Sequence, residues 1–139
     1  MNAIEIVDAF LHAYWHQQHE RTLALATEDF LWLNMPYPKL RIEGRGALRE
    51  VLYAPNMGYP EPVEEGHHVV GLVMSRGDEV MQERVDRFKV RGTWVEIPCN
   101  GIWRVRDGRV ALWKDYFDGE TYARQMAAVG VRVDLSMWL

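Results

Sequence analysis

Two strand-like segments of the chain carry acidic and basic residues that could perform acid–base chemistry. Side chains at positions i and i+2 of a strand share a face, so Arg84 and Asp86 lie on one face of the segment Glu79–Val90. Both faces of that segment hold charge, and the alternation alone does not say which face is enclosed. In the segment Val110–Phe117, Asp115 is the single carboxylate on a side that otherwise holds only alanine and aromatic residues. That side is expected to face inward, which predicts an enclosed carboxylate.

A third segment places an indole and an amide on one face, at Trp32 and Asn34. If this face converges with those of Arg84, Asp86 and Asp115, the interior holds two carboxylates, one guanidinium and one amide. Burying such a cluster is costly unless its charges are paired, and the planar fork of an arginine can donate to both carboxylates. Two carboxylates around one guanidinium titrate as a coupled pair, so one can act as an acid while the other acts as a base.

The same residues also fit plainer interpretations. An Arg-x-Asp pattern on a strand is typical of a solvated face or a surface ion pair, and Asp115 could cap the helix that follows it. His12 and His16 have a spacing that helical metal ligands use, but no third ligand lies beside them, so we expect a solvated helix face and no metal site. Cys99 lies on an apolar face and is expected to be a small hydrophobic residue rather than a nucleophile.

The elements that must position these residues follow from hydrophobic periodicity and turn residues. Helices are expected from Asn2 to about His19 and at Arg21–Ala26, Gly46–Leu52 and Gly119–Val129; strands are expected at Phe30–Met35, Val63–Met74, Glu79–Val90, Thr93–Val105 and Val110–Phe117. The Pro- and Gly-rich run Ala54–Pro62 is expected to be a loop without regular structure, of a kind that can close over a pocket. This order predicts an α+β fold in which helices pack on a strongly curved mixed or antiparallel sheet and enclose a pocket.

Composition sets the class of protein. The chain has 139 residues, of which 48% are hydrophobic and 26% charged, so we expect one globular domain over residues 1–139 with a core that needs no metal or disulfide. The net charge of −4 argues against nucleic acid or an anionic membrane surface as a partner. The single cysteine and the lack of a secretory-signal pattern at the N-terminus favour the cytoplasm.

Three short motifs resemble the limonene-1,2-epoxide hydrolase family, which lies within the nuclear transport factor 2-like, SnoaL-like superfamily of cone-shaped α+β domains. The motifs are Asn34-Met35-Pro36, Glu83-Arg84-Val85-Asp86 and the run from Trp113 to Asp118. The aromatic-acidic run is shared by much of the superfamily and supports the fold; the other two are the sharper signal. The expected element order matches the fold over nearly the whole chain.

The resemblance implies a one-step, cofactor-independent opening of an epoxide by water. Asp115 matches the family's general base, Asp86 matches the general acid, and Arg84 matches the residue that bridges them. Asn34 matches an amide that helps to hold the water. The family has a tyrosine two residues before this asparagine, and here the position is Trp32, whose indole N–H can donate to a water but cannot accept from it.

The substrate is expected to be a hydrophobic small molecule, an epoxide that gives a vicinal diol. An apolar pocket wall is expected from the residues around the cluster: Met35, Phe88, Ile97, Cys99 and Phe117. Two other functions stay open: a SnoaL-like cyclase or ketosteroid-isomerase-like isomerase in which Asp115 removes a proton next to a carbonyl, and a protein that binds a small molecule without catalysis. A homodimer is expected through the outer face of the sheet, which carries Trp94, Pro98 and Ile102.

Overall fold

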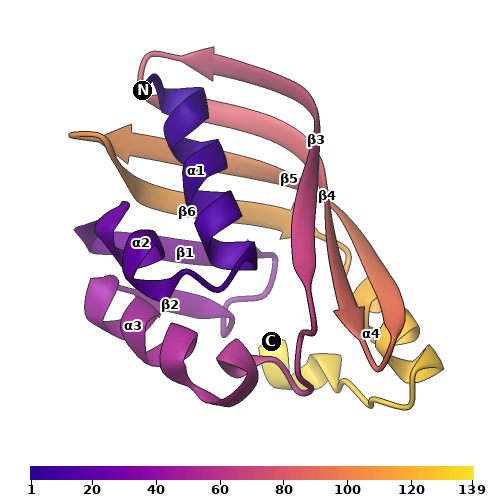
Figure 1. The fold of residues 1–139 in the computed structure, drawn as a ribbon. Coiled ribbons are helices and arrows are strands. Elements are labelled where there is room, and N and C mark those ends of the chain that lie inside the picture. Colours follow the sequence, from indigo (N-terminus) through magenta and orange to yellow (C-terminus); the bar gives the residue numbers. More distant parts are fainter.

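A computed structural model describes residues 1–139 as helices packed on one six-stranded sheet (Figure 1). The helices are α1 (Ala3–Trp15), α2 (His19–Ala24), α3 (Arg45–Tyr53) and α4 (Gly119–Ala128), with short 3-10 helices at Pro55–Gly58 and Leu135–Trp138. The strands are β1 (Ala26–Met35), β2 (Arg41–Glu43), β3 (Gly66–Arg76), β4 (Glu79–Val90), β5 (Thr93–Arg106) and β6 (Arg109–Phe117). None of the helices is long and apolar enough to span a membrane.

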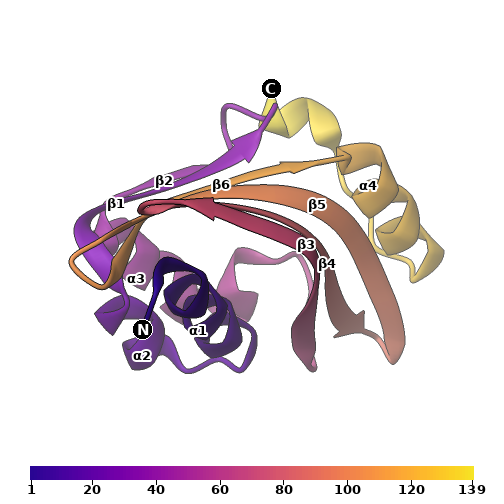
Figure 2. The ribbon, with the colours of Figure 1, turned by 90° about the horizontal axis from the view of Figure 1, so that it is seen from above.

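The sheet is mixed and strongly bent. Its strand order is β2-β1-β6-β5-β4-β3, in which β1 and β6 run parallel and all other neighbours run antiparallel. Strands β3 to β6 form an antiparallel meander. Figure 2 shows α1, α2 and α3 on the concave side of the bend, while α4 packs against β5. This is the predicted α+β fold, and the concave side is where a pocket can form.

Helix α1 covers the concave face because its apolar side chains recur at helical spacing. Asn2 accepts from the backbone N–H of Glu5, and the Glu5 side chain accepts from the backbone N–H of Asn2, which completes a capping box at the start of the helix. Its buried side includes Phe10, Leu11 and Tyr14, and it packs against strands β3 to β6. The helix thereby forms one wall of the space above the sheet.

Several predicted boundaries were wrong. The first helix ends at Trp15 rather than His19, because Gln17 adopts a left-handed backbone conformation (φ 56°). Strand β1 begins at Ala26 instead of Phe30, because the buried Ala26 continues the pairing with β6. The run Ala54–Pro62, expected to lack regular structure, contains a 3-10 turn.

Strand register aligns side chains of four strands into two neighbouring rows on the concave face. We call the first the polar row; crossing β1, β6, β5 and β4, it consists of Asn34, Asp115, Gly101 and Gln82. The second, the indole row, lies two residues away and consists of Trp32, Trp113, Trp103 and Val80. The site is built on these two rows.

Candidate active site

Arg84 reaches from β4 across β5 to β6, and a glycine makes this crossing possible. A Cβ atom at Gly101 would lie 2.6 Å from Nη1 of Arg84 and 3.0 Å from Oδ1 of Asp115. Real Cβ atoms do not approach other atoms so closely, so the guanidinium occupies space that a side chain at position 101 would fill. The polar row therefore has a gap in its third position, and Arg84 lies over that gap.

All five N–H donors of the Arg84 guanidinium are used. Nε and Nη2 donate to Oδ1 and Oδ2 of Asp86 at 2.9 and 3.0 Å. Nη1 and Nη2 donate to Oδ1 and Oδ2 of Asp115 at 2.9 and 2.5 Å. The remaining N–H of Nη1 donates to Oε1 of Gln82 at 3.1 Å. Arg84 is 1% exposed, so this pairing is what allows its charge to be buried.

Gln82 links the polar row to the indole row by hydrogen bonds. Its Oε1 also accepts from Nε1 of Trp103 at 2.7 Å, so one amide oxygen holds both the guanidinium and an indole. The guanidinium carbon lies 5.8 and 5.9 Å from the rings of Trp103 and Trp113, within the range of a cation–π contact. Arg84 is thus fixed by carboxylates, by an amide and by aromatic faces.

The two carboxylates differ in their surroundings. Burial raises the pKa of Asp115, the Arg84 guanidinium lowers it, the charge of Asp86 raises it, and the nearby indole of Trp113 lowers it weakly; the net direction is upward. Burial alone would lower the pKa of Arg84, but the two carboxylates raise it well above its usual value, so the guanidinium stays charged. The side chain of Asp86 is 13% exposed and that of Asp115 is 7% exposed. The site therefore holds two unequal carboxylates that share one permanent cation.

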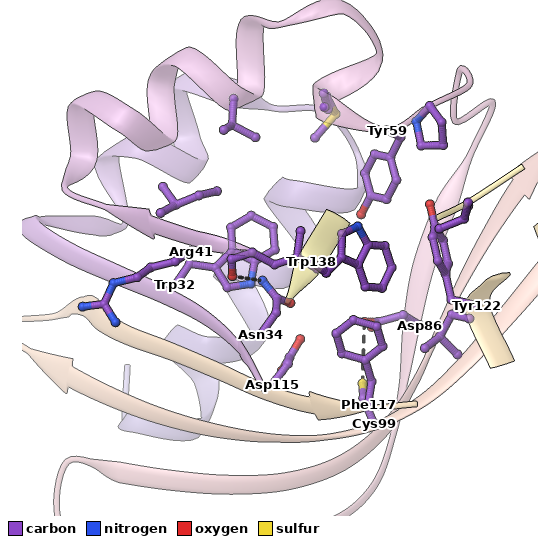
Figure 3. A pocket seen from close by; sticks show the side chains of 18 of the residues that line it. Trp32, Asn34, Arg41, Tyr59, Asp86, Cys99, Asp115, Phe117, Tyr122 and Trp138 are labelled. Atoms are coloured by element: carbon purple, nitrogen blue, oxygen red, sulfur yellow. Dashed lines mark hydrogen bonds between the residues drawn. The ribbon is translucent and has the colours of Figure 1, made fainter. Parts of the chain in front are cut away.

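Asn34 lies beside Asp115 in the polar row and is held by its own turn. Its Nδ2 donates to the backbone carbonyl of Leu40 at 3.1 Å, which orients the amide oxygen (Figure 3). The backbone N–H of Lys39, in the same turn, donates to the carbonyl of Trp138 at 3.2 Å. The turn after β1 is thereby tied to the C-terminal segment.

The indole row is a stack of three rings. Trp32 stacks on Trp113 with ring centroids 3.9 Å apart, and Trp113 stacks on Trp103 at 5.1 Å. Trp32 is 9% exposed, and its Nε1 is buried without a hydrogen-bond partner, as is Nε1 of Trp113. A buried donor without a partner is unusual and calls for an explanation. At Trp32 the donor belongs to a residue that lines the pocket next to Asn34.

A cavity of about 570 Å³ opens above the two rows, a size typical of small-molecule sites. Most of its lining is apolar, and both carboxylates, Asn34 and Trp32 lie in its wall (Figure 3). Four of the five residues expected in the wall line this cavity: Phe88, Ile97, Cys99 and Phe117. Met35 does not, and that prediction was wrong. It follows Asn34 on β1, so its side chain lies on the opposite face of the sheet, in a separate hollow beside Tyr37.

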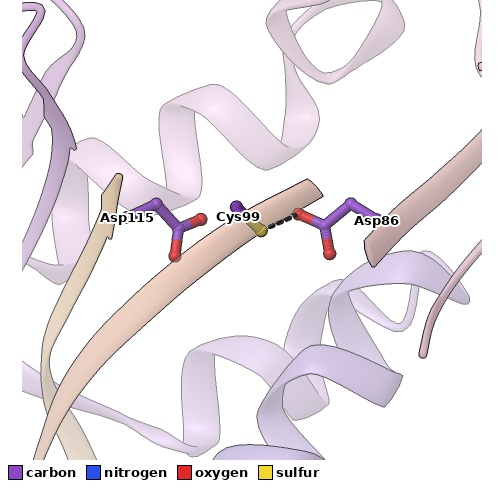
Figure 4. Close-up of side chains that lie close together, drawn as sticks. All are labelled: Asp86, Cys99 and Asp115. Carbon is purple, nitrogen blue, oxygen red and sulfur yellow. Dashed lines mark hydrogen bonds between the residues drawn. The ribbon is translucent and has the colours of Figure 1, made fainter. Parts of the chain in front are cut away.

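Cys99 lies between the two carboxylates on the neighbouring strand (Figure 4). Its Sγ donates to Oδ2 of Asp86 at 3.6 Å, and burial raises the pKa of the thiol, so it is neutral. Cys99, Asp86 and Asp115 bring ligand-type atoms within 4.8 Å of one another, an arrangement that could hold a metal ion. In this structure the carboxylate oxygens already accept four hydrogen bonds from Arg84, which supplies the positive charge between them.

Sequence reasoning missed several residues around the site. Gln82 shares the strand face of Arg84 and Asp86, so the alternation in β4 could have identified it. The role of Gly101 depends on register between strands, which the sequence does not show. Tyr59 follows the 3-10 turn in the Pro- and Gly-rich run and had no periodic signal.

The bent mixed sheet and the enclosed cavity place the protein among the SnoaL-like α+β folds. A solved structure described as a SnoaL-like polyketide cyclase, from Shewanella putrefaciens CN-32, matches with a TM-score of 0.77 and 15% identity over 91% of this chain and 96% of that one. A protein with a ketosteroid isomerase-like fold from Catenulispora acidiphila DSM 44928 matches with a TM-score of 0.73 and 19% identity, over 88% of this chain and 92% of that one. At these identities the likeness is one of fold alone.

Within that class, the chain belongs to the limonene-1,2-epoxide hydrolase family. The model of the limonene-1,2-epoxide hydrolase catalytic domain matches residues 1–128. Epoxide hydrolase EphG of Mycobacterium tuberculosis (strain ATCC 25618 / H37Rv) is 29% identical over 112 residues, which cover 81% of this chain and 70% of that protein. The solved structure of an M. tuberculosis LEH-like epoxide hydrolase has a TM-score of 0.74 and 26% identity, over 92% of this chain and 94% of that chain. The expected family membership is confirmed.

Proposed function

We propose that this protein is an epoxide hydrolase that adds water to a hydrophobic epoxide in one step and releases a vicinal diol. The observation that carries the proposal is the pairing of Asp86 and Asp115 by a single buried guanidinium at the floor of an apolar cavity. Ring strain already makes an epoxide reactive, so the protein has only to orient a water and to exchange protons with it and with the leaving oxygen.

In the proposed reaction, Asp115 is the base and Asp86 is the acid. Asp115 takes a proton from the water as the water oxygen bonds to an epoxide carbon. The bond between that carbon and the epoxide oxygen breaks, and Asp86 gives its proton to the oxygen. After one turnover the proton has moved from Asp86 to Asp115, and its return restores the enzyme. The two carboxylates carry one negative charge throughout, which Arg84 balances at every stage.

The water can be held by three neighbours. One hydrogen points to Asp115, and the second points to the amide oxygen of Asn34, which is free because Nδ2 is engaged by Leu40. Nε1 of Trp32 has no partner within the chain but is itself buried, so its ring must turn toward the cavity before it can donate to a lone pair of the water. The other lone pair then faces the epoxide carbon. Trp32 would thus take over a position where the family has a tyrosine, acting as a donor only.

Asp86→Asn is the decisive variant, tested against Glu83→Gln, an exposed side chain on the opposite face of the same strand. A positioned general acid contributes about 10²- to 10⁴-fold. Diol formation from a panel of terpene, cyclic and styrene-type epoxides should therefore fall by at least about 100-fold in Asp86→Asn and stay unchanged in Glu83→Gln. In ¹⁸O-labelled water under single-turnover conditions, label should enter the first diol formed by the wild type.

Other outcomes of this experiment reject the proposal. Label that appears only in later turnovers indicates a covalent ester on the enzyme. Carbonyl isomerisation that survives Asp86→Asn indicates the cyclase or isomerase function. Ligand affinity without turnover by the wild type indicates a binding protein.

A homodimer is part of the proposal. The outer face of the sheet exposes apolar side chains that register brings together, among them Met74, Met81 and Ile102. Both methionines are more than half exposed, which leaves a large apolar patch uncovered in the monomer. Light scattering of the wild type should give twice the monomer mass, and Met81→Glu should shift the equilibrium toward the monomer. A monomeric wild type at micromolar concentration contradicts this arrangement.

A further inference from the structure

Two tyrosine hydroxyls meet inside the cavity, away from the charged cluster. Tyr14 comes from α1, Tyr59 follows the 3-10 helix Pro55–Gly58, and both line the pocket. Their hydroxyl oxygens are 2.9 Å apart, and neither hydroxyl makes another hydrogen bond within the chain. Burial raises the pKa of both phenols, and the charges of the site carboxylates raise them further, so both are neutral at physiological pH.

A pair of neutral hydroxyls that bond only to each other has one hydrogen left over. Each hydroxyl has one O–H, and a single O–H···O bond uses one of the two. Tyr14 is 2% exposed and is packed edge-on against the rings of Trp32 and Trp113, with centroids 5.5 and 5.3 Å apart. Tyr59 is only partly buried. Either hydroxyl can be the donor of this bond; because Tyr14 is the more confined of the two, the arrangement that lets the pair bind a ligand has Tyr14 donate to Tyr59 and the hydrogen of Tyr59 directed into the cavity.

The hydroxyl hydrogen of Tyr59 is best suited to bind a neutral acceptor. An anion next to the phenols would be repelled by Asp86 and Asp115, whose charges already act on both tyrosines or on one of them. Arg84 balances one charge of the carboxylate pair, and the other cations that line the pocket, Lys39, Arg41 and Arg132, make no hydrogen bond to either hydroxyl. A carbonyl or hydroxyl oxygen accepts a hydrogen bond without adding charge, and a donor that is itself accepting a bond is strengthened.

We propose that Tyr59, supported by Tyr14, binds a second oxygen of the substrate, so that the preferred substrates are epoxides that also carry a keto or hydroxyl group. Figure 3 shows Tyr59 entering the pocket from the segment after α3, away from the strand that carries Asp86. A substrate can therefore present its epoxide to the carboxylates and a separate oxygen to Tyr59. The binding of an acceptor oxygen stands independently; the substrate class rests on the proposed hydrolase function.

A pair of unreactive ligands tests the binding directly. The probes are 4-methylcyclohexanone and 1-methyl-4-methylidenecyclohexane, which differ only in C=O against C=CH₂. The wild-type protein should bind the ketone about fivefold to tenfold more tightly, as measured by quenching of tryptophan fluorescence or by ligand-observed NMR. Equal affinity of the wild type for the two probes overturns the proposal without any variant.

Three conservative variants locate the donor. Tyr59→Phe should abolish the preference for the ketone, and Tyr14→Phe should reduce it, because Tyr59 keeps its hydrogen but loses its support. Tyr122→Phe removes a neighbouring pocket hydroxyl that makes no hydrogen bond to the pair, and it should keep the preference. A preference that survives in Tyr59→Phe, or disappears in Tyr122→Phe, rejects the assignment. If Tyr14→Phe does not fold, the wild type and Tyr59→Phe still decide.

Turnover separates this inference from the proposed function. The substrates are two matched epoxides that carry, away from the epoxide ring, either a keto group or a methylidene group. The wild type should show a lower KM for the keto substrate, and Tyr59→Phe should raise the KM for that substrate alone. If the protein prefers the ketone in binding but hydrolyses no epoxide, the proposed hydrolase function is rejected and the oxygen-binding site at Tyr59 is supported. If the protein hydrolyses epoxides but shows no such preference in either binding or KM, the oxygen-binding site is rejected and the proposed hydrolase function is supported.

Discussion

The polar row and the indole row lie next to each other on the same strands, yet they differ in how many of their hydrogen-bonding groups have a partner. Arg84, which lies over the gap in the polar row, uses all five of its donors on Asp86, Asp115 and Gln82. In the indole row, only Trp103 uses its N–H, while those of Trp32 and Trp113 make no hydrogen bond. The charged groups are therefore fixed in place, and the uncommitted donors belong to the aromatic side chains around them.

This difference corresponds to two tasks that the proposed hydrolase site would need. Buried charges are stable only when each is paired, so a row that holds them has little freedom to bind anything else. A buried indole N–H without a hydrogen-bond partner costs far less free energy than an unpaired buried charge, because the rest of the ring is stabilised by packing. The charges can then handle protons, while the unpaired indole N–H groups stay buried within the packed aromatic part of the site.

The largest expected effect is on stability and comes from removing the guanidinium that lies over the polar row. Arg84→Met leaves two buried carboxylates without a cation, and the free energy of unfolding should fall by about 3–5 kcal/mol. Arg104→Met, at an exposed arginine of β5, should change it by less than about 0.5 kcal/mol. Urea denaturation measures both. Equal losses in the two variants would show that the buried pairing contributes nothing specific.

Filling the gap in the polar row should have the next largest effect. Gly101→Ala puts a methyl group where Nη1 of Arg84 lies, and overpacking of this kind costs about 1–3 kcal/mol. Diol formation should be lost with it, because the guanidinium can no longer hold both carboxylates. Gly46→Ala, in α3 with no atom within 4 Å of the new methyl, should be as stable as the wild type or more so. An active Gly101→Ala would show that the crossing of Arg84 over β5 is not needed.

The link between the rows can be measured by comparing two buried tryptophans. Trp103→Phe removes an N–H that donates to Gln82, whereas Trp113→Phe removes one that makes no hydrogen bond. Trp113 stacks on two rings and Trp103 on one, so packing alone would make Trp113→Phe the less stable variant. Leaving the buried Gln82 oxygen underused should cost Trp103→Phe about 1–3 kcal/mol and reverse that order. Thermal unfolding followed by circular dichroism gives the two values. The idea of a link fails if Trp113→Phe is the less stable variant.

The smallest effect concerns pH. Because burial raises the pKa of Asp115, this base becomes protonated at a higher pH than an ordinary aspartate, whose pKa is about 3.9. A protonated Asp115 cannot take a proton from water, so kcat/KM should fall as the pH is lowered, with an apparent pKa that belongs to the coupled pair and lies above that of an ordinary aspartate. A pH profile between about 3.5 and 8, with circular dichroism at each pH as a control for unfolding, tests this. An acid limb below pH 3.9 contradicts it.

Alternation along single strands predicted much of the site. The parity of Arg84 with Asp86, the enclosure of Asp115 and the shared face of Trp32 and Asn34 all follow from a period of two. The same rule, applied strictly, places Met35 on the other face, so that error could have been avoided.

Features that depend on pairing between strands could not be predicted. Nothing in the sequence shows that Gly101 lies between Gln82 and Asp115, because register is set by the packing of the whole sheet. The meeting of Tyr14 with Tyr59 joins a helix to an irregular segment 45 residues later. For the same reason the ends of helices and strands moved by several residues, since burial and pairing override local propensity there.

The tie between the turn after β1 and the C-terminal segment has a practical consequence. The amide proposed to aim the water depends on the Leu40 carbonyl, and the adjacent Lys39 is held by Trp138, the penultimate residue of the sequence. A substitution that loosens the segment around Trp138 would release the turn and disturb a group more than a hundred positions upstream. Residues that touch neither the cavity nor the charged cluster can therefore change how Asn34 is oriented.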